Sequence, residues 1–310
     1  MRICSFLPSA TEIVYALELG DSLYGVSHEC DYPAEASVKP RVVKSKFDPA
    51  DYTSHEIDRL VSDMTSRGER IYEVDVDTLA QARPDLVITQ ELCDVCAISS
   101  EDVQRAIHDL DTPPQLISLD PVSLEDLMGD IERLGEVTGT TERARELTAN
   151  LRLRSETVRV KAAETAARPR VACIEWLDPV IVAGHWIPEM VHLAGGVDVL
   201  GRSGAPSRRI GMDELASHNP EVLILMPCGM DVGRTVQEYS CLGNLEEWIA
   251  LTAIQDGRAY AADAGALFSR SGPRLVDGLE IMAQMVHPEV FADPLPQGSA
   301  KPLQGSYSLS

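Results

Sequence analysis

Hydrophobic positions recur with two different periods along the chain, and together they predict strands that alternate with helices. Apolar runs typical of buried strands cover 2–7, 23–27, 85–89, 115–119, 170–176, 221–226 and 259–262. Amphipathic spacing predicts helices over 13–19, 54–67, 77–82, 100–109, 123–137, 188–193, 213–218 and 271–285. We expect loop at 8–12 and irregular chain at 39–52. This alternation predicts an α/β fold with mainly parallel sheets.

The longest predicted helix covers residues 141–166, a charged stretch without proline or glycine. Its apolar residues fall on one side of the helix: Ala144, Leu147, Leu151, Val158 and Ala162. At about 1.5 Å per residue the helix would be roughly 39 Å long. A helix of that length with so narrow an apolar stripe is better suited to joining two bodies than to lying inside one.

An internal repeat supports two similar lobes. The segment Asp77–Ile88 aligns without a gap on Asp213–Ile224, and residues 12–15 weakly resemble 189–192. We therefore predict an N-terminal lobe at 1–122, a helical linker at 123–167, a C-terminal lobe at 168–292 and a flexible tail at 293–310. Ligands of such folds bind beyond the carboxyl ends of the strands, so we expect a ligand cleft between the lobes.

Composition narrows the class of partner. The formal charge is 27 − 49 = −22, which argues against nucleic acid. No apolar run reaches the length of a membrane span, so the protein is not expected to be membrane-embedded. The first strand starts at residue 2, which leaves no room for a signal peptide; we expect a cytoplasmic protein unless a leader was removed. The seven cysteines do not have the spacing of a disulfide framework, which indicates reduced thiols. We also expect a monomer.

Four motifs occur in a characteristic order over roughly residues 1–290: LPSATE at 7–12, DYP at 31–33, RPDLVI at 83–88 and FSRSGPR at 268–274. With them the chain resembles the helical-backbone (class III) periplasmic binding proteins, and most of all the group that binds vitamin B12 (cobalamin) for ABC importers, together with its leaderless relatives. The resemblance implies two Rossmann-like lobes joined by one rigid helix, with a corrinoid or an iron chelate in the cleft. It also implies an ABC permease as a partner.

The segments expected to face the cleft contain thirteen candidate ligand-binding residues. They are Ser9, His28, Glu29, Cys30, Tyr32, Cys93, Asp94, Trp176, His185, Trp186, Cys228, Phe268 and Arg270. A corrin ring is a broad, mostly apolar disc fringed with amides, so its site needs flat aromatic surfaces and a few hydrogen-bond donors. An ordinary position in the hydrophobic core explains Trp176 more readily than Trp186. For Trp248 we predict a core position. Arg270 could donate to the ligand or pair with a nearby carboxylate.

Two aspartates occupy matching places in the repeat, Asp77 and Asp213. In the family that the chain resembles, an acidic residue on each lobe docks on arginines of the permease, and Glu214 is a neighbouring candidate. The alternative is that both aspartates are N-caps of their short helices.

Imidazole and thiolate are both suitable ligands for cobalt, so His28 or Cys30 could be an axial ligand of a bound corrinoid. The pair Cys93 and Cys96, with the same two residues, could instead hold a structural zinc ion. Besides cobalamin, an iron-siderophore or haem is an alternative ligand. The alternative of another class is a cytosolic enzyme that uses Cys93 and Cys96 with a metal, but the sequence has no GxSxG, P-loop, GxGxxG or HExxH motif and we expect no catalysis.

Overall fold

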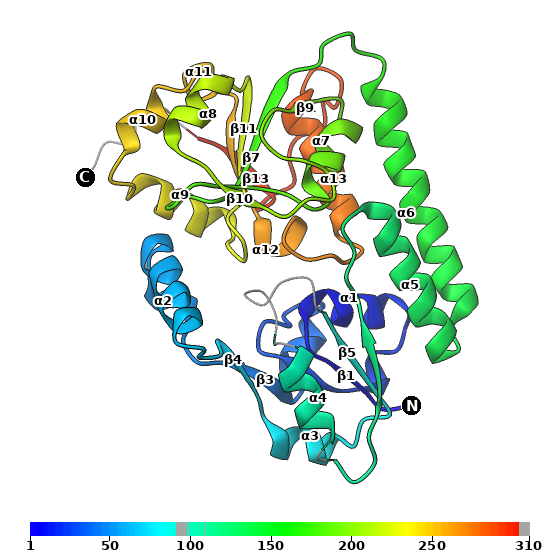
Figure 1. Ribbon diagram of the computed structural model, residues 1–310. Helices are drawn as coiled ribbons and strands as arrows, with labels where there is room; N and C mark the ends of the chain where they lie inside the picture. The colour runs from blue at the N-terminus through cyan, green and yellow to red at the C-terminus, as the bar shows by residue number, and fades with distance from the viewer. Residues whose placement is uncertain (91–97, 99, 109, 304–310) are drawn as a thin grey trace. The chain divides into compact units, whose positions relative to one another are not determined.

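A computed structural model describes residues 1–90, 98, 100–108 and 110–303 (Figure 1). The chain forms two compact units. The first comprises Met1–Tyr52, Glu56–Pro121 and Glu125–Ala149, and the second comprises Thr53–His55, Val122–Leu124 and Asn150–Ser310. Two short segments, 53–55 and 122–124, thus group with the second unit, although both come before the long helix in the chain.

The first unit is built on a six-stranded sheet with the order β4-β3-β2-β1-β5-β6. Its strands are β1 Ile3–Ser5, β2 Leu23–Ser27, β3 Arg41–Ser45, β4 Tyr72–Val74, β5 Leu86–Thr89 and β6 Gln115–Ser118. Every pair is parallel except β3 and β4, which are antiparallel. Its helices are α1 Pro8–Ala16, α2 Ser54–Ser66, α3 Val76–Ala82 and α4 Ser100–His108. The prediction of irregular chain at 39–52 is wrong for β3, which pairs with β2 and β4 but has too short an apolar run to be recognised in the sequence.

The second unit has a seven-stranded sheet with the order β10-β8-β7-β11-β12-β13, and β9 pairs with β7. Its strands are β7 Arg170–Trp176, β8 Ile181–Val182, β9 Val197–Asp198, β10 Arg208–Arg209, β11 Val222–Leu225, β12 Ala259–Ala262 and β13 Ala300–Pro302. The central strands β7, β11 and β12 are parallel to one another. The prediction of a flexible tail is wrong for β13, which pairs antiparallel with β12 because backbone hydrogen bonds need no apolar sequence signal.

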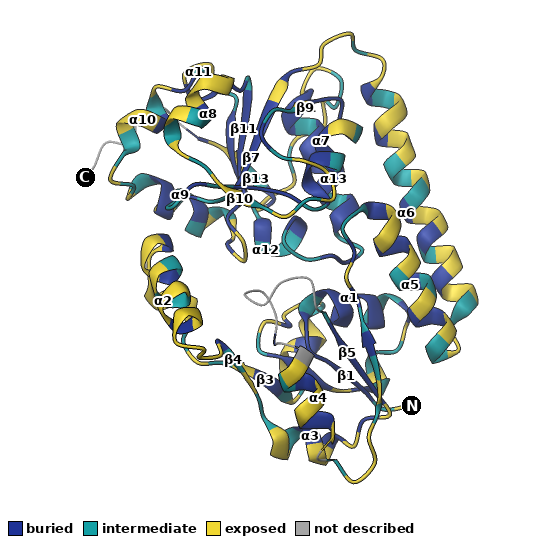
Figure 2. Ribbon diagram, in the orientation of Figure 1, coloured by how far each residue is buried: buried dark blue, intermediate teal, exposed yellow. Residues whose placement is uncertain are grey.

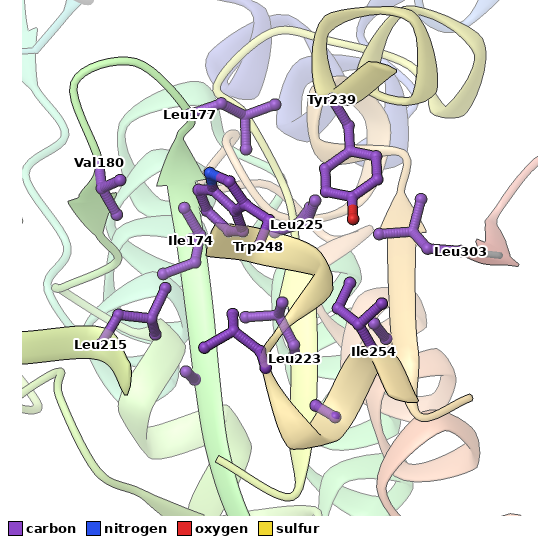
Figure 3. Close-up of a cluster of buried hydrophobic side chains, with 14 of the residues drawn as sticks. Ile174, Leu177, Val180, Leu215, Leu223, Leu225, Tyr239, Trp248, Ile254 and Leu303 are labelled. Carbon is purple, nitrogen blue, oxygen red and sulfur yellow. The ribbon is translucent and has the colours of Figure 1, made fainter. Parts of the chain in front are cut away.

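Seven helices are described in the second unit, at α7 Ile187–Leu193, α8 Met212–His218, α9 Val232–Ser240, α10 Leu245–Ile249, α11 Thr252–Gln255, α12 Ala264–Leu267 and α13 Leu275–Val286. One of its cores lies between the sheet and helices α8 to α11, and contains Leu223, Leu225, Tyr239 and Trp248 (Figure 3). The Trp248 side chain has no exposed surface, which confirms it as a core residue.

Two consecutive helices connect the units, α5 Leu124–Thr138 and α6 Thr141–Ala162. Helix α6 is four residues shorter at its end than the predicted 141–166. Ala144, Leu151, Val158 and Ala162 are buried on one side of it, while its other side is exposed (Figure 2). The unit boundary falls between Ala149 and Asn150, within α6. The long helix is therefore one continuous element shared by both units, as the sequence predicts.

The first helix starts earlier than the sequence predicts. Helix α1 begins at Pro8 instead of residue 13, and Ser9 to Glu12 are buried in its first turns. Proline suits this position, because the first N–H groups of a helix have no intrahelical acceptor and its fixed φ is already helical. The motif at 7–12 is therefore the N-cap residue and the first residues of α1, and not a loop.

The internal repeat is present in the structure. Helix α3 ends at Ala82 and helix α8 at His218, and each is followed by a residue in the left-handed conformation, Arg83 with φ of 45° and Asn219 with φ of 43°. A proline comes next, Pro84 or Pro220, and then a central strand, β5 or β11. Proline has no N–H with which to continue a helix and disfavours the α-helical conformation in the residue before it, which explains why both helices end at the same place in the repeat.

Candidate ligand-binding site

The carboxyl ends of β1, β2 and β5 lie side by side in the first unit, because all three strands are parallel. They end in the hydroxyl residues Ser5, Ser27 and Thr89, all of which are buried. Ser9 is buried in the first turn of α1, directly after β1. In an α/β sheet this edge is the place where ligands bind.

His28 follows β2 at this edge. Its backbone N–H donates to the carbonyl of Val43 at 3.0 Å, and its ring lies 5.4 Å from that of Tyr72. The Nδ1 atom is buried and has no hydrogen-bond partner among the described residues. Burial lowers the pKa of His28, although the nearby Glu29 carboxylate acts in the opposite direction. The imidazole is thus held in its neutral form, which is the form that binds a metal.

A very small pocket lies beside this ring. It has a volume of about 10 Å³ and is lined by Phe6, Pro8, Ser27, His28, Glu29, Val43, Tyr72 and Ile98. That volume is about what one water molecule needs. A macrocycle therefore cannot enter this pocket and could only lie over it.

Cys30 is placed differently from His28. It has no exposed surface, its Sγ lies 3.1 Å from Thr11 Oγ1, and it donates to Ser27 Oγ at 3.6 Å. Burial raises its pKa, so the group is a protonated, enclosed thiol. About a quarter of the His28 side chain is exposed. Of the two candidate axial ligands, only His28 is therefore accessible in the described structure.

The other candidates of the first unit divide by exposure. Tyr32 is about half exposed, and Glu29 is also exposed. Cys93, Asp94 and Cys96 lie outside the described residues, so their role as ligand or metal residues stays a prediction.

In the second unit, Trp176 ends the central strand β7 and is half-buried. Its indole N–H donates to the carbonyl of Ser54 at 3.1 Å. Cys228 follows the neighbouring strand β11 and is exposed; its backbone N–H donates to the carbonyl of Glu175 at 3.0 Å. These two side chains stand at the carboxyl ends of adjacent parallel strands, which corresponds to the edge at which His28 lies in the first unit.

His185 lies in the turn between β8 and α7, with a positive φ of 51°. The backbone N–H of His185 donates to the carbonyl of Ala205 at 2.7 Å, and the backbone N–H of Gly204 donates to the carbonyl of His185 at 2.9 Å. The Nδ1 atom is buried without a partner among the described residues, and burial lowers the pKa of the ring. Like His28, this residue is an imidazole with a buried Nδ1 and a pKa that burial lowers.

Trp186 and Phe268 are core residues. Trp186 is 7 % exposed and Phe268 is 2 % exposed, and the indole N–H of Trp186 donates to the carbonyl of Phe268 at 2.9 Å. They tie the start of α7 to the end of α12. The sequence ranks Trp176 as the better core candidate, and the structure reverses this order because Trp186 turns inward at the start of its helix.

Arg270 is half-buried after α12. Burial raises the pKa of Asp263, and the charge of Arg270 partly offsets this rise. Arg270 is therefore close enough to the Asp263 carboxylate to interact with it. Pairing with a nearby carboxylate is one of the two roles that the sequence predicts for Arg270.

The N-cap explanation of Asp77 and Asp213 is wrong. Helix α3 is capped by Asp75, whose Oδ1 accepts the N–H of Thr78 at 2.9 Å, and the N-cap of α8 is Gly211. Both aspartates are the second residues of their helices and are exposed. Glu214 is less available, since it accepts a hydrogen bond from Arg208 at 2.6 Å that lowers its pKa.

One buried acidic side chain was not singled out from the sequence. Glu238 on α9 is 6 % exposed, and its carboxylate accepts the backbone N–H of Ser54 at 2.8 Å and pairs with Arg234. The spacing of Arg234 and Glu238, one helical turn apart, is the signal that could have pointed to it. Nothing in the sequence pairs it with Ser54.

In the part of the chain that the structure describes, no three side chains of the types that bind metals come together. Within the same residues, no helix has both the length and the apolar character required to cross a membrane. The ligand cleft expected between the lobes stays a prediction.

The fold and the sheet-edge site define an α/β binding protein with two lobes, and comparison with known proteins agrees. Residues 3–266 match the family model described as periplasmic binding protein. The chain is 24 % identical over 297 residues to the uncharacterized ABC transporter substrate-binding lipoprotein YvrC of Bacillus subtilis, covering 94 % of this chain and 82 % of that protein. It is 23 % identical over 287 residues to the vitamin B12-binding protein of Vibrio cholerae, covering 90 % and 86 %.

Solved structures show the same fold. The periplasmic heme-binding protein of Pseudomonas aeruginosa superposes with a TM-score of 0.70 at 20 % identity, covering 98 % of this chain and 95 % of that one. The vitamin B12-binding protein BtuF of Vibrio cholerae gives 0.67 at 21 % identity, covering 94 % and 98 %. Because the family match spans most of its length, the chain belongs to the periplasmic binding protein family. It is a substrate-binding protein of the type that works with ABC importers.

Proposed function

We propose that this protein binds cobalamin or a related corrinoid and hands it on without chemical change. The observation that carries the proposal is the 23 % identity to a vitamin B12-binding protein over 90 % of the chain. Further relatives with the same name match at 22 % and 25 % identity. The function is then reversible binding, with the corrinoid as cargo and no catalytic cofactor.

The candidate ligand-binding residues divide by exposure. Those that a ligand could reach are His28, Glu29, Tyr32, Trp176, His185, Cys228 and Arg270. Ser9, Cys30, Trp186 and Phe268 are buried. Tyr32 and Trp176 would offer aromatic surface to a flat ligand, and the other accessible residues would offer polar groups to its fringe.

We further propose that His28 coordinates the cobalt in place of one of the two axial ligands that the free corrinoid carries. Its ring is neutral, partly exposed and bordered by a pocket too small for anything but a small group. The enclosed thiol of Cys30 is a poor competitor, since it would have to lose its proton and its hydrogen bonds to Thr11 and Ser27.

A second candidate ligand is haem or another iron chelate. Proteins of the same fold are named heme-binding, among them those of Pseudomonas aeruginosa and Vibrio cholerae. A neutral histidine also suits iron in a porphyrin. The two ligands differ in their fringes: haem carries carboxylates that favour cationic partners, whereas corrin amides need neutral donors and acceptors.

Parallel titrations of the apo protein with cyanocobalamin and with haemin test the proposal, followed by visible absorbance and by heat. We expect saturable binding of cyanocobalamin. Binding of haemin alone would replace the first candidate by the second, and binding of neither would refute both. If the purified protein instead contains zinc in proportion to Cys93 and Cys96, the metal or thiol enzyme becomes the better interpretation.

The coordination by His28 has its own readout. His28→Ala is expected to change the visible bands of the bound corrinoid, because an axial nitrogen ligand alters the cobalt spectrum. His218→Ala, which removes an exposed histidine on α8, serves as the control. Identical bands in the wild type and in both variants would exclude coordination.

A further inference from the structure

A tight turn at the end of β2 carries two of the candidate ligand-binding residues. His28 and Glu29 are the central residues of the four-residue turn 27–30, which is closed by the N–H of Cys30, donating to the carbonyl of Ser27 at 3.2 Å. The side chains of His28 and Glu29 are 26 % and 43 % exposed, whereas Ser27 and Cys30 are buried. The turn therefore presents two polar side chains between two enclosed corner residues.

Arg41, the first residue of β3, joins the two corners of this turn. Its Nη1 atom donates to the carbonyl of Ser27 at 2.6 Å and to the carbonyl of Cys30 at 2.9 Å. Its Nη2 atom donates to the carbonyl of Ser37 at 3.1 Å. A guanidinium carries five N–H groups in one rigid plane, so a single arginine can hold several carbonyls in a fixed arrangement. The backbone at both ends of the turn is thus bonded to one side chain.

The side chains of the same two corners are held by α1. Cys30 Sγ lies 3.1 Å from Thr11 Oγ1 and 3.6 Å from Ser27 Oγ, and Thr11 donates to Ser5 Oγ at 2.9 Å. These contacts end on side-chain atoms, which can rotate about their own bonds. The hydrogen bonds from Arg41 end on backbone carbonyls, and the backbone sets the path of the turn. The two sets of contacts therefore act on different parts of the same corners.

We propose that Arg41 is a positioning residue of the ligand site: by fixing both corners of the turn, it sets the direction in which His28 and Glu29 face the ligand. The importance of that direction for the ligand rests on the proposed function. A binding group has to be held within about 0.5 Å of its productive place by the residues around it. The sheet builds this support in, because β2 and β3 are parallel neighbours and their register sets Arg41 opposite Val26.

Two variants separate the geometry of Arg41 from its charge. Arg41→Gln removes both the planar fork and the charge, while Arg41→Lys keeps the charge and is the milder change if the first variant does not fold. The control is Arg258→Gln, since Arg258 is also half-buried and donates to a backbone carbonyl, that of Val286 at 2.8 Å, within the second unit. Thermal unfolding compares the stability of the three variants.

The direct readout is the position of the His28 ring in the apo protein. Its ring resonances are recorded by NMR at pH 8, above the ordinary pKa of an imidazole, and are identified by their loss in His28→Ala. The Tyr72 ring lies 5.4 Å from that of His28, so a reoriented imidazole changes its chemical shifts. A general loss of stability leaves the shifts of the folded protein unchanged. The functional readout is the dissociation constant for cyanocobalamin.

We expect both Arg41 variants to shift the His28 ring resonances and to bind cyanocobalamin about tenfold more weakly, which is the effect of one lost charge-assisted hydrogen bond. The control should change neither. Unshifted resonances in Arg41→Gln would refute the positioning role, and wild-type behaviour of Arg41→Lys would refute the part played by the fork. Shifted resonances with unchanged affinity would refute the link to the ligand.

The outcome for the proposed function is separate. If the wild type binds neither cyanocobalamin nor haemin, the proposed function fails. The resonances of His28 in the apo protein still decide whether Arg41 sets the turn, because that measurement uses no ligand. An equal loss of affinity in Arg258→Gln would show a general effect of stability and would overturn the role of Arg41.

Discussion

Arg154 of the linking helix α6 holds Glu280 of α13 with two parallel hydrogen bonds. Its Nε donates to Oε1 at 2.9 Å and its terminal nitrogen to Oε2 at 2.7 Å, and Asp277 accepts a further bond at 2.5 Å. The planar guanidinium matches a carboxylate in this two-point geometry, and lysine cannot reproduce it. The second half of α6 is thus fixed to the second unit by one side chain with two acidic partners.

Arg154→Lys should therefore lower the free energy of unfolding, by about 1 kcal/mol after allowance for partial exposure. Urea denaturation followed by circular dichroism measures this. Arg159→Lys is the control, because Arg159 pairs with Glu156 on the exposed side of the same helix, where no measurable change is expected. Equal losses in the two variants would contradict a special role for Arg154.

Gly184→Ala should disturb the turn that carries His185. A Cβ atom at this glycine would lie 2.3 Å from the carbonyl oxygen of Ala205 and 2.6 Å from the backbone nitrogen of Ser207. Backbone cannot move aside as a side chain can, so we expect a loss of about 2–3 kcal/mol in thermal or urea unfolding. Gly243→Ala, where no atom lies within 4 Å, is the control. A stable Gly184→Ala protein would show that this turn is not constrained.

Stability should fall as the pH drops below about 6.5, partly because of His28 and His185. Burial lowers the pKa of both rings in the folded state. At acidic pH the unfolded chain then binds more protons than the folded chain. The free energy of unfolding therefore falls as the pH drops below the pKa of these histidines in the unfolded chain, and it is unaffected well above that pKa. Urea denaturation at pH 7, 6 and 5 should show a smaller pH dependence in His28→Asn and His185→Asn than in the wild type. An unchanged dependence in both variants would refute this assignment.

The thiols should fall into two groups in a thiol-reagent titration of the native protein. Cys228 and Cys241 are exposed and should react at once, whereas Cys4, Cys30 and Cys173 are buried and should react only on unfolding. Burial raises the pKa of all three, that of Cys4 to about 12. A background with Cys93→Ser and Cys96→Ser isolates these five residues. Fast reaction of a third thiol would contradict the enclosed position of Cys30.

Charge reversal at Asp77 and Asp213 should abolish stimulation of the ATPase of a cognate ABC importer, because both carboxylates are exposed and neither is the N-cap of its helix. Asp77→Lys with Asp213→Lys is the test. Glu246→Lys with Glu247→Lys, two exposed reversals on α10, makes the same change of net charge and is the control. Stimulation that survives the double variant would exclude docking through these residues.

The sequence predicted the central strands and the repeat because both depend on local patterns of apolar residues and prolines. Continuous apolar runs mark β5, β7 and β11, and the prolines at Pro84 and Pro220 set the turns before two of them. The fold class followed from their alternation with amphipathic helices. Strands β3, β4 and β13 were missed, since they are short, carry polar residues and depend on backbone pairing with other strands.

The candidate site was predicted less well than the fold. The predicted strand ends put His28, Trp176 and His185 among the residues expected to face the ligand, but they could not distinguish an accessible ring from a buried one. Trp186 and Phe268 turned out to be core residues, and the link from Glu238 to Ser54 joins positions with no sequence relationship. Burial and long-range hydrogen bonds depend on the tertiary fold, which local periodicity does not encode.

Strand β13 has a practical consequence for anyone who shortens or tags this protein. It covers the outer hydrogen-bonding groups of β12, a strand made only of buried residues. A truncation before residue 300 would leave those groups open to pairing with another molecule, so it should promote self-association instead of simply trimming the end. An affinity tag is better placed beyond residue 303, where β13 stays intact.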